Sequence, residues 1–316
     1  MSGTKQDNSK YILKNMTDED YNQNLTYLTT ISSYAASECH PMPPEAIAVM
    51  ISEIAKKYEE IFDIAKLDYI NDENLKDTPF RIASMYINEL LIGRYTKPPR
   101  IEGFPADYYH YIVNESPTDK IKNLYERLDG IERTFYSDFA TGGFKTTLLN
   151  SLLSESEMIL EQIRELEDEF YSENSSIQKV PLRNMVVKTV DINSLCSHHF
   201  IPFVSTDEKS SKCIIAYIPR LGSKKALLGI SKLQRIADYF GRRPQLQETL
   251  NWQIKAFVSL ILRSPDVMVS FHNIIHYCEK TRGVESHCGS TSSIEFTGKY
   301  TIAENRDLVF KLSENL

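Results

Sequence analysis

The spacing of apolar residues changes along this chain of 316 residues, and that change most constrains its fold. Up to about residue 173, apolar residues recur every three or four positions, the period of an amphipathic helix. Beyond that point, segments with the two-residue alternation of strands flank two further helical patterns. In order they are strands 184–192 and 211–219, helices 232–240 and 245–263, and strands 266–277 and 290–300. This order predicts an α+β fold, an antiparallel β-sheet with helices packed on one face.

The N-terminal part begins with a polar stretch, residues 1–25, that we expect to be disordered. The segment 43–66 predicts a helix that starts at prolines. The segment 76–93 predicts a second helix, and Gly93 is expected to end it.

Residues 115–173 are charged and follow a heptad-like pattern that "ATGGF" (140–144) interrupts. The pattern predicts two antiparallel helices, a helical hairpin inserted into the chain. We expect it to protrude and to be dispensable for the core fold. Two interpretations stay open, a solvated insertion that packs on itself and a docking arm for another subunit or protein. The expected divisions are 1–25, an N-terminal helical region 26–97, the hairpin with its linkers 98–181, and a catalytic core 182–316.

Composition narrows the class of protein. The net charge of −7 argues against a broad nucleic-acid-binding surface. The chain has no apolar run of 18 residues and no apolar signal-peptide core, so we expect a cytoplasmic protein with no membrane span. Five sparse cysteines do not form a disulfide framework, which leaves metal binding or burial.

Two Cys/His clusters predict a metal site. "SLCSHHF" (194–200) contains Cys196, His198 and His199. "HYC" (276–278) adds His276 and Cys278, and Cys278 follows Cys196 by 82 residues. Zinc favours thiolate and imidazole, and a catalytic zinc keeps three protein ligands and an open fourth position. In a strand, His276 and Cys278 would point to the same face. The spacing favours Cys196, His199 and Cys278 as ligands, which leaves His198 and His276 free for proton transfer. The other cysteines, Cys39, Cys213 and Cys288, are interpreted as core or surface residues.

A basic group and a carboxylate complete the candidates. Ser231 stands at an expected helix start, with Lys232 and Arg235 on one helical face, and Arg282 follows Cys278 by four residues. A helix N-terminus with Lys and Arg can bind an anion, although such residues are often only solvated. Glu248 is by default a surface residue. In a cleft its carboxylate could accept the two adjacent N–H groups of guanine.

Four ordered stretches resemble the GTP cyclohydrolase I family. They are "CSHH", "GISKLQR", "RRPQLQE" and "HYCEKTRGV", and upstream "DTPFRIASMY" is similar to another family motif. The resemblance covers residues 44–96 and 182–300. It implies a tunnelling fold, an antiparallel sheet backed by helices, assembled into a homo-oligomeric ring, usually a decamer, with sites between subunits.

The resemblance also implies residue roles. Cys196, His199 and Cys278 would bind Zn²⁺, which makes a hydroxide available for attack on C8 of GTP. His198 and His276 would move protons as the imidazole ring opens. The guanine would be anchored by Glu248 with Gln247, and the triphosphate by Ser231, Lys232, Arg235, Arg282 and Arg81. Formate and 7,8-dihydroneopterin triphosphate would be the products.

The chain departs from the family pattern at three places, and alternatives remain. Ser197 replaces the usual Glu of the Cys/His motif, Ser84 replaces a Lys, and 115–173 replaces a short connection. These departures motivate a second hypothesis, a non-catalytic zinc-stabilised ring that binds purine nucleotides and presents the hairpin to partners. A deazaguanine nitrile reductase is disfavoured, because Cys196 and Cys278 are already assigned to zinc. Whether the product would serve folate or deazapurine synthesis stays open.

Overall fold

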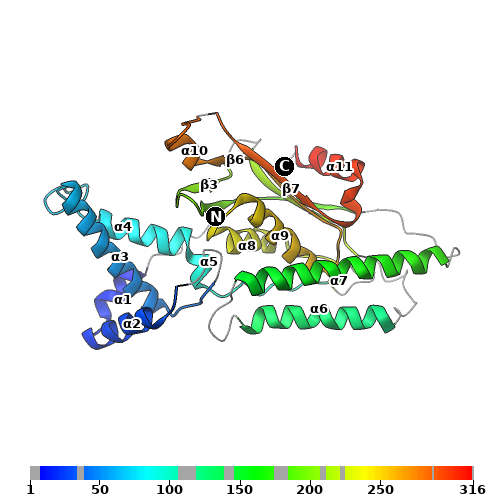
Figure 1. The fold of residues 1–316 in the computed structure, drawn as a ribbon, viewed down its shortest axis with the longest axis horizontal. Coiled ribbons are helices and arrows are strands. Elements are labelled where there is room, and N and C mark those ends of the chain that lie inside the picture. The colour runs from blue at the N-terminus through cyan, green and yellow to red at the C-terminus, as the bar shows by residue number, and fades with distance from the viewer. Residues whose placement is uncertain are drawn as a thin grey trace.

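The structure is a computed structural model that describes residues 8–33, 39–105, 119–138, 146–173, 184–206, 211–220, 225–286 and 288–314. Figure 1 shows three parts: a group of N-terminal helices, a central sheet with its own helices, and a long helical hairpin along one side. None of the described helices is both long and apolar enough to cross a membrane.

The sheet is mainly antiparallel, as predicted. Its strands are β1 (Val186–Val190), β2 (Asn193–Cys196), β3 (Pro202–Val204), β4 (Lys212–Tyr217), β5 (Pro244–Gln245), β6 (Val267–His276) and β7 (Thr291–Phe296). Their order is β1-β4-β6-β3-β2-β5, and β7 also pairs with β6. Among the strand pairs that the structure describes, only β2–β5 is parallel. The sequence did not predict β2, β3 and β5, since strands of two to four residues are too short to show an alternation.

Helices cover both faces of this sheet. The predicted helices, α8 (Ile230–Gly241) and α9 (Gln247–Leu262), pack on one face. β4 shows the two-sided burial: Cys213 and Ile215 belong to the cluster that includes α8 and α9, whereas Ile214 lies in a separate cluster with Val309. Val309 belongs to α11 (Ala303–Ser313), a helix that was not predicted from the sequence. The predicted α+β layer is therefore confirmed, and α11 adds cover on part of its second face.

The N-terminal residues that the structure describes are helical, so the prediction of disorder up to residue 25 is wrong for 8–25. These residues form α1 (Ser9–Asn15) and most of α2 (Asp18–Thr30). A capping box between Thr17 and Asp20 starts α2, because each residue satisfies a backbone N–H of the other. Both helices pack on α3 (Pro44–Ala65), the predicted helix that begins at prolines.

The second predicted helix is divided into three pieces and extends beyond its expected end. It consists of α4 (Thr78–Ser84), a π-helical segment η1 (Met85–Leu90) and α5 (Ile92–Tyr95). Gly93 does not end it. A Cβ at Gly93 would lie 2.7 Å from the carbonyl oxygen of Tyr239, and the Gly93 N–H donates to the carbonyl of Arg242 at 3.0 Å. Glycine is needed there because α5 closely approaches the end of α8.

The predicted hairpin is present as α6 (Asp119–Asp138) and α7 (Thr146–Glu173), and the expected break at 140–144 lies outside the described residues. The expectation that it protrudes is wrong. Phe135, Leu149 and Leu153 are buried in the central core, and the Phe135 ring lies 4.7 Å from that of Phe257 on α9. Figure 1 shows α7 running alongside the helices of the sheet, with α6 on its outer side. The hairpin therefore belongs to the core of the protein.

Candidate metal centre

The first Cys/His cluster lies in a tight turn between β2 and β3. Cys196 ends β2, and its carbonyl accepts hydrogen bonds from the N–H groups of His199 (3.3 Å) and Phe200 (2.9 Å). The Cys196 N–H donates to Ile201 at 3.0 Å, which closes the turn. Phe200 has a left-handed backbone, with φ of 54°. We call residues 196–201 the metal turn.

The second cluster lies where β6 ends. β6 stops at His276, and Cys278 lies in the short helix α10 (Tyr277–Thr281). The expectation that His276 and Cys278 share one face of a strand is therefore wrong, because the strand ends between them. The ligand set expected from their spacing nevertheless converges. One donor atom from each of Cys196, His199 and Cys278 lies within 4.8 Å of the others.

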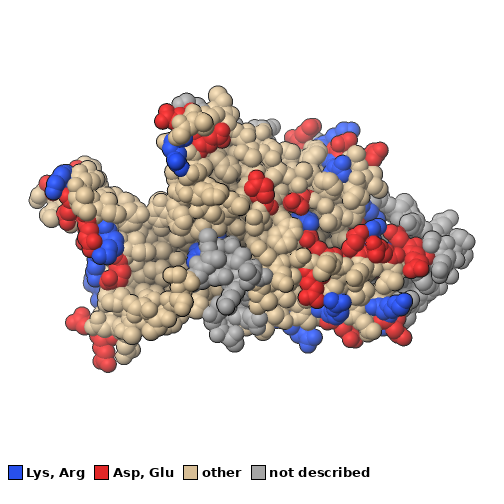
Figure 2. All heavy atoms as spheres, in the orientation of Figure 1, with Lys and Arg blue, Asp and Glu red and all other residues tan. Residues whose placement is uncertain are grey.

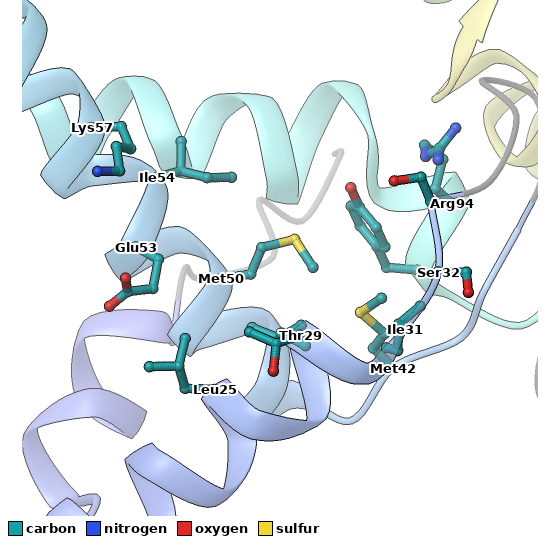
Figure 3. Close-up of a pocket in the computed structure, with 13 residues that line it drawn as sticks. Leu25, Thr29, Ile31, Ser32, Met42, Met50, Glu53, Ile54, Lys57 and Arg94 are labelled. Carbon is teal, nitrogen blue, oxygen red and sulfur yellow. The ribbon is translucent and has the colours of Figure 1, made fainter.

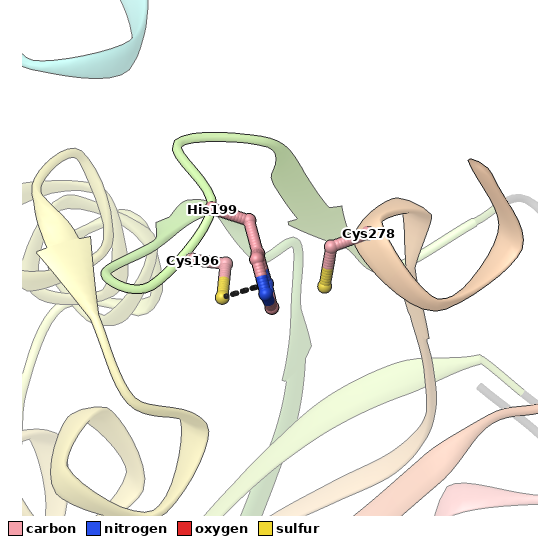
Figure 4. A group of neighbouring side chains, drawn as sticks. All are labelled: Cys196, His199 and Cys278. Atoms are coloured by element: carbon pink, nitrogen blue, oxygen red, sulfur yellow. Dashed lines mark hydrogen bonds between the residues drawn. The ribbon is translucent and has the colours of Figure 1, made fainter. Parts of the chain in front are cut away.

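These three side chains fit a soft divalent metal ion. Figure 4 shows them extending to the same side from the metal turn and from the start of α10. Cys196 Sγ lies 3.5 Å from His199 Nδ1. Burial, followed by the neighbouring Cys196, raises the pKa of the Cys278 thiol. A bound cation would remove that penalty on the thiolates, and two thiolates with one imidazole form a donor set typical of zinc. His199 is exposed, so the group is open to solvent on one side.

His276, the last residue of β6, is held by contacts with β3 and α9. Its ring stacks on Phe203 of β3, with centroids 4.7 Å apart. Its Nε2 lies 2.7 Å from Oε1 of Gln247, the first residue of α9. Burial lowers the pKa of His276, and the carboxylates of Glu248 and Glu279 oppose that shift. The sequence motifs "RRPQLQE" and "HYC" thus meet in space.

Gln247 in turn is held by residues that the sequence analysis missed. Its Nε2 donates to Ser293 Oγ at 3.0 Å, and Asn251 Nδ2 reaches the same oxygen at 3.1 Å. Gln247 is 3% exposed and Asn251 is fully buried. Neither Ser293 nor Asn251 stands in a recognised motif, and their sequence context carries no signal of this role.

The remaining site candidates come from several elements of the chain; we call Cys196, His199 and Cys278 the metal group. His198 is exposed, with its ring centroid 6.0 Å from that of His199. The basic group is placed as follows: Ser231, Lys232 and Arg235 on the first turns of α8, Arg282 just after α10, and Arg81 on α4. Among the described residues, no hydrogen bond or ion pair joins this basic group to Cys196, His199 or Cys278. Arg81 is exposed and lies 3.8 Å from Asp77.

Two positions of the N-terminal helices bear on the site. Tyr86 of η1 donates its hydroxyl to the carbonyl of Phe200 at 3.2 Å, which ties these helices to the metal turn. Ser84, where the family pattern has Lys, is buried and accepts a hydrogen bond from Asn88 at 3.1 Å. Asn88 also donates to Ser9 of α1 at 3.2 Å. The short side chain therefore serves the packing of α1.

A separate hollow lies among the N-terminal helices. Its volume is about 600 Å³, and Figure 3 shows the apolar side chains of Leu25, Met50 and Ile54 lining it, with Glu53 and Lys57 beside them. None of the cysteine or histidine residues of the metal group lines it. The chemistry expected of the chain therefore belongs to the metal turn and not to this hollow.

The fold and the site define an α+β protein with a candidate metal centre of two thiols and one imidazole at the end of an antiparallel sheet. A family model described as GTP cyclohydrolase I matches residues 154–314, about half of the chain. The match includes the C-terminal part of α7. The chain belongs to the GTP cyclohydrolase I family, a family of hydrolases.

Similar proteins carry the same description over a longer stretch. GTP cyclohydrolase 1 of Salmonella choleraesuis (strain SC-B67) is 26% identical over 254 residues, which are 80% of this chain and 78% of that relative. GTP cyclohydrolase 1 of Pectobacterium carotovorum subsp. carotovorum (strain PC1) is 26% identical over 252 residues, 80% of this chain and 77% of the relative.

Proposed function

We propose that the protein is a zinc-dependent GTP cyclohydrolase I. In this reaction water adds at C8 of GTP, the imidazole ring opens, C8 leaves as formate, and the ribose rearranges to give 7,8-dihydroneopterin triphosphate. The observation that carries the proposal is the convergence of Cys196, His199 and Cys278 next to the ordered pair His276–Gln247. Family membership supports the choice of reaction.

Cys196, His199 and Cys278 would hold the zinc ion. Zinc in an open three-ligand site supplies a Lewis acid and lowers the pKa of water toward neutrality. The protein's own residues do the rest. His276, whose Nε2 faces Gln247, keeps Nδ1 available to take up and return a proton. His198 is exposed beside His199 and would be the second proton carrier.

Substrate binding is proposed for two further groups. Glu248 is exposed at the first turn of α9, next to His276, where its carboxylate would accept two N–H groups of the guanine. The triphosphate would be bound by Ser231, Lys232, Arg235, Arg282 and Arg81. By family resemblance, a complete site would combine residues of two subunits in a homo-oligomeric ring, usually a decamer.

The proposed setting is cytoplasmic, with a product that enters folate or deazapurine synthesis. Turnover tests the central proposal directly. The zinc-loaded wild type, incubated with GTP, is expected to release formate and to give a fluorescent pterin after oxidation. The variant Cys278→Ala is expected to give neither. Binding of GTP without turnover by the wild type would instead support the purine-nucleotide-binding ring.

A further inference from the structure

The α6–α7 hairpin meets the core through oppositely charged side chains. Lys255 of α9 and Arg263, which directly follows α9, are only 3% and 4% exposed. Lys255 Nζ lies 2.5 Å from Glu157 of α7, and Arg263 Nη2 lies 2.6 Å from Asp129 of α6. Further pairs join Arg263 and Lys225 to Glu132, and Arg220 to Glu167. Figure 2 shows acidic side chains gathered along the hairpin side of the face in view. The hairpin therefore has one fixed position on α9.

A buried chain of amides continues from the hairpin into the sheet. Gln253 of α9 donates from Nε2 to Asn150 Oδ1 of α7 at 2.9 Å. Gln253 Oε1 in turn accepts from Gln245 Nε2 at 2.9 Å. Gln253 is fully buried and Gln245 is 2% exposed. Gln245 Nε2 also donates to the carbonyl of Phe240 at 3.0 Å. The Nε2 atom of Gln245 is therefore held by two buried acceptors, Gln253 Oε1 and the carbonyl of Phe240.

Gln245 fixes the strand on which the metal turn rests. β5 consists of Pro244 and Gln245 alone, and it pairs with β2 so that Cys196 lies opposite Gln245. The N–H of Ser197, inside the metal turn, donates to the Gln245 carbonyl at 3.1 Å. Pro244 has no N–H to offer to a ladder. A two-residue strand has little backbone pairing of its own, so the Gln245 side chain contributes to holding its position.

We propose that Asn150 is a positioning residue for the metal turn and that the hairpin serves as a brace for the metal centre. The proposal rests on the proposed metal site. The path is Asn150, Gln253, Gln245 and Ser197, and each step is a hydrogen bond of 3.1 Å or less. Contiguous hydrogen-bonded groups of this kind orient metal ligands from outside the ligand shell. The hairpin thereby acquires a role in holding the metal site.

Loss of the Asn150 acceptor has a defined consequence. Without Asn150, the Gln253 N–H that donates to it would be left in the core without a partner, which is energetically unfavourable. The Gln253 amide relieves this by rotating, and rotation breaks its bond to Gln245. The Gln245 side chain then loses one of its two hydrogen-bond partners, so β5 is held less firmly. The metal turn, which pairs with β5, is then less well held in the geometry that binds the ion.

The test measures zinc affinity in the full-length protein, by titrating the metal-free protein against a chromophoric chelator. Asn150→Ala is expected to weaken zinc binding about three- to tenfold, less than the ~10- to 100-fold cost of removing a group that contacts a ligand directly. Asn150→Asp keeps an acceptor for Gln253 and is expected to bind zinc like the wild type. If Asn150→Ala is insoluble, Asn150→Ser replaces it, because its hydroxyl is too short to reach Gln253.

The matched control is Glu157→Gln, which weakens the hairpin's hold on Lys255 without touching the amide chain. It is expected to lower the unfolding temperature but to leave the zinc affinity unchanged. Wild-type affinity in Asn150→Ala would overturn the proposal. Equal loss of zinc affinity in Glu157→Gln would also overturn it, because affinity would then follow overall stability. Zinc is measured without GTP, so absence of turnover would reject the proposed reaction and leave this result standing.

Discussion

Gln247 Oε1 lies 2.7 Å from Nε2 of His276, and this contact determines which ring nitrogen carries the hydrogen. An amide oxygen only accepts, so Nε2 donates and Nδ1 is left with its lone pair. Phe203 fixes the plane of the ring by stacking, and Ser293 fixes the direction of the Gln247 amide. His276 is therefore held in one orientation before any substrate binds.

Replacing Gln247 with a side chain of similar size but no polar group, Gln247→Leu, tests this relationship. His276 would lose its acceptor and its fixed orientation. We expect kcat for GTP to fall about 10- to 100-fold, the usual cost of losing a group that orients a functional histidine. KM for GTP is expected to stay near the wild-type value, because the lost contact is made to the enzyme and not to the substrate. Steady-state kinetics measure both.

Two variants of Ser293 provide the control. Ser293→Thr keeps the hydroxyl that holds Gln247 and is expected to behave like the wild type, whereas Ser293→Ala is expected to lower kcat to a lesser degree than Gln247→Leu. A raised KM with an intact kcat in Gln247→Leu would contradict this role. It would assign Gln247 to the guanine instead, as the family resemblance implies.

The sequence indicated the three candidate ligands, whose donor atoms converge, but not the residues that hold Gln247 and His276. Cys196, His199 and Cys278 were recognisable because metal chemistry restricts the residue types and their spacing. Cys278 lies in α10 and not on the predicted strand, although its Sγ still converges with the other two donor atoms. Ser293 and Asn251 could not be found, because a hydroxyl or an amide that binds another side chain leaves no periodic pattern.

In the fold too, long elements were predictable from the sequence and short ones were not. Long segments with a clear apolar period, such as α3 and β6, were predicted close to their observed bounds. β5 has two residues and no period of its own, and its place is set by Gln245. The hairpin helices were predicted, but their docking was not. Partners such as Lys255 and Glu157 lie 98 positions apart in the sequence.

If Cys278 is a zinc ligand, the zinc content of the purified protein should depend on it. Cys278→Ala removes one of three donors, so we expect the purified protein to contain little zinc and to give no pterin from GTP. Elemental analysis checks the first expectation and the fluorescence assay the second. Cys288→Ser is the matched control, since Cys288 is exposed and not part of the metal group. Stoichiometric zinc in Cys278→Ala would contradict the proposed ligand set.

The ion pair Lys255–Glu157 is expected to stabilise the contact between the hairpin and α9. Glu157→Ala leaves the ammonium of Lys255 buried without its partner and takes the acceptor from Trp252 Nε1, which lies 2.8 Å from Glu157. We expect the free energy of unfolding to fall by about 3–5 kcal/mol, as for other broken buried pairs. Urea denaturation measures it. The double variant Lys255→Met with Glu157→Leu is expected to recover much of the loss, and no recovery would contradict this account.

His272 is expected to make the stability of the sheet sensitive to acid. Its Nε2 lies 2.8 Å from Ser270 Oγ, and its ring packs edge-on against Phe310 of α11. Burial, with a smaller effect of Lys212, lowers the pKa of His272 below the ordinary value of 6.5. Above that value the ring is neutral in both states and contributes no pH dependence. As the pH falls below it, the unfolded chain takes up the proton first, so stability is lost until the lower folded-state pKa is reached.

The wild type should therefore lose more unfolding free energy than His272→Gln between about pH 7 and about pH 5. Urea denaturation at each pH measures this loss, and parallel curves for the two proteins would refute the assignment.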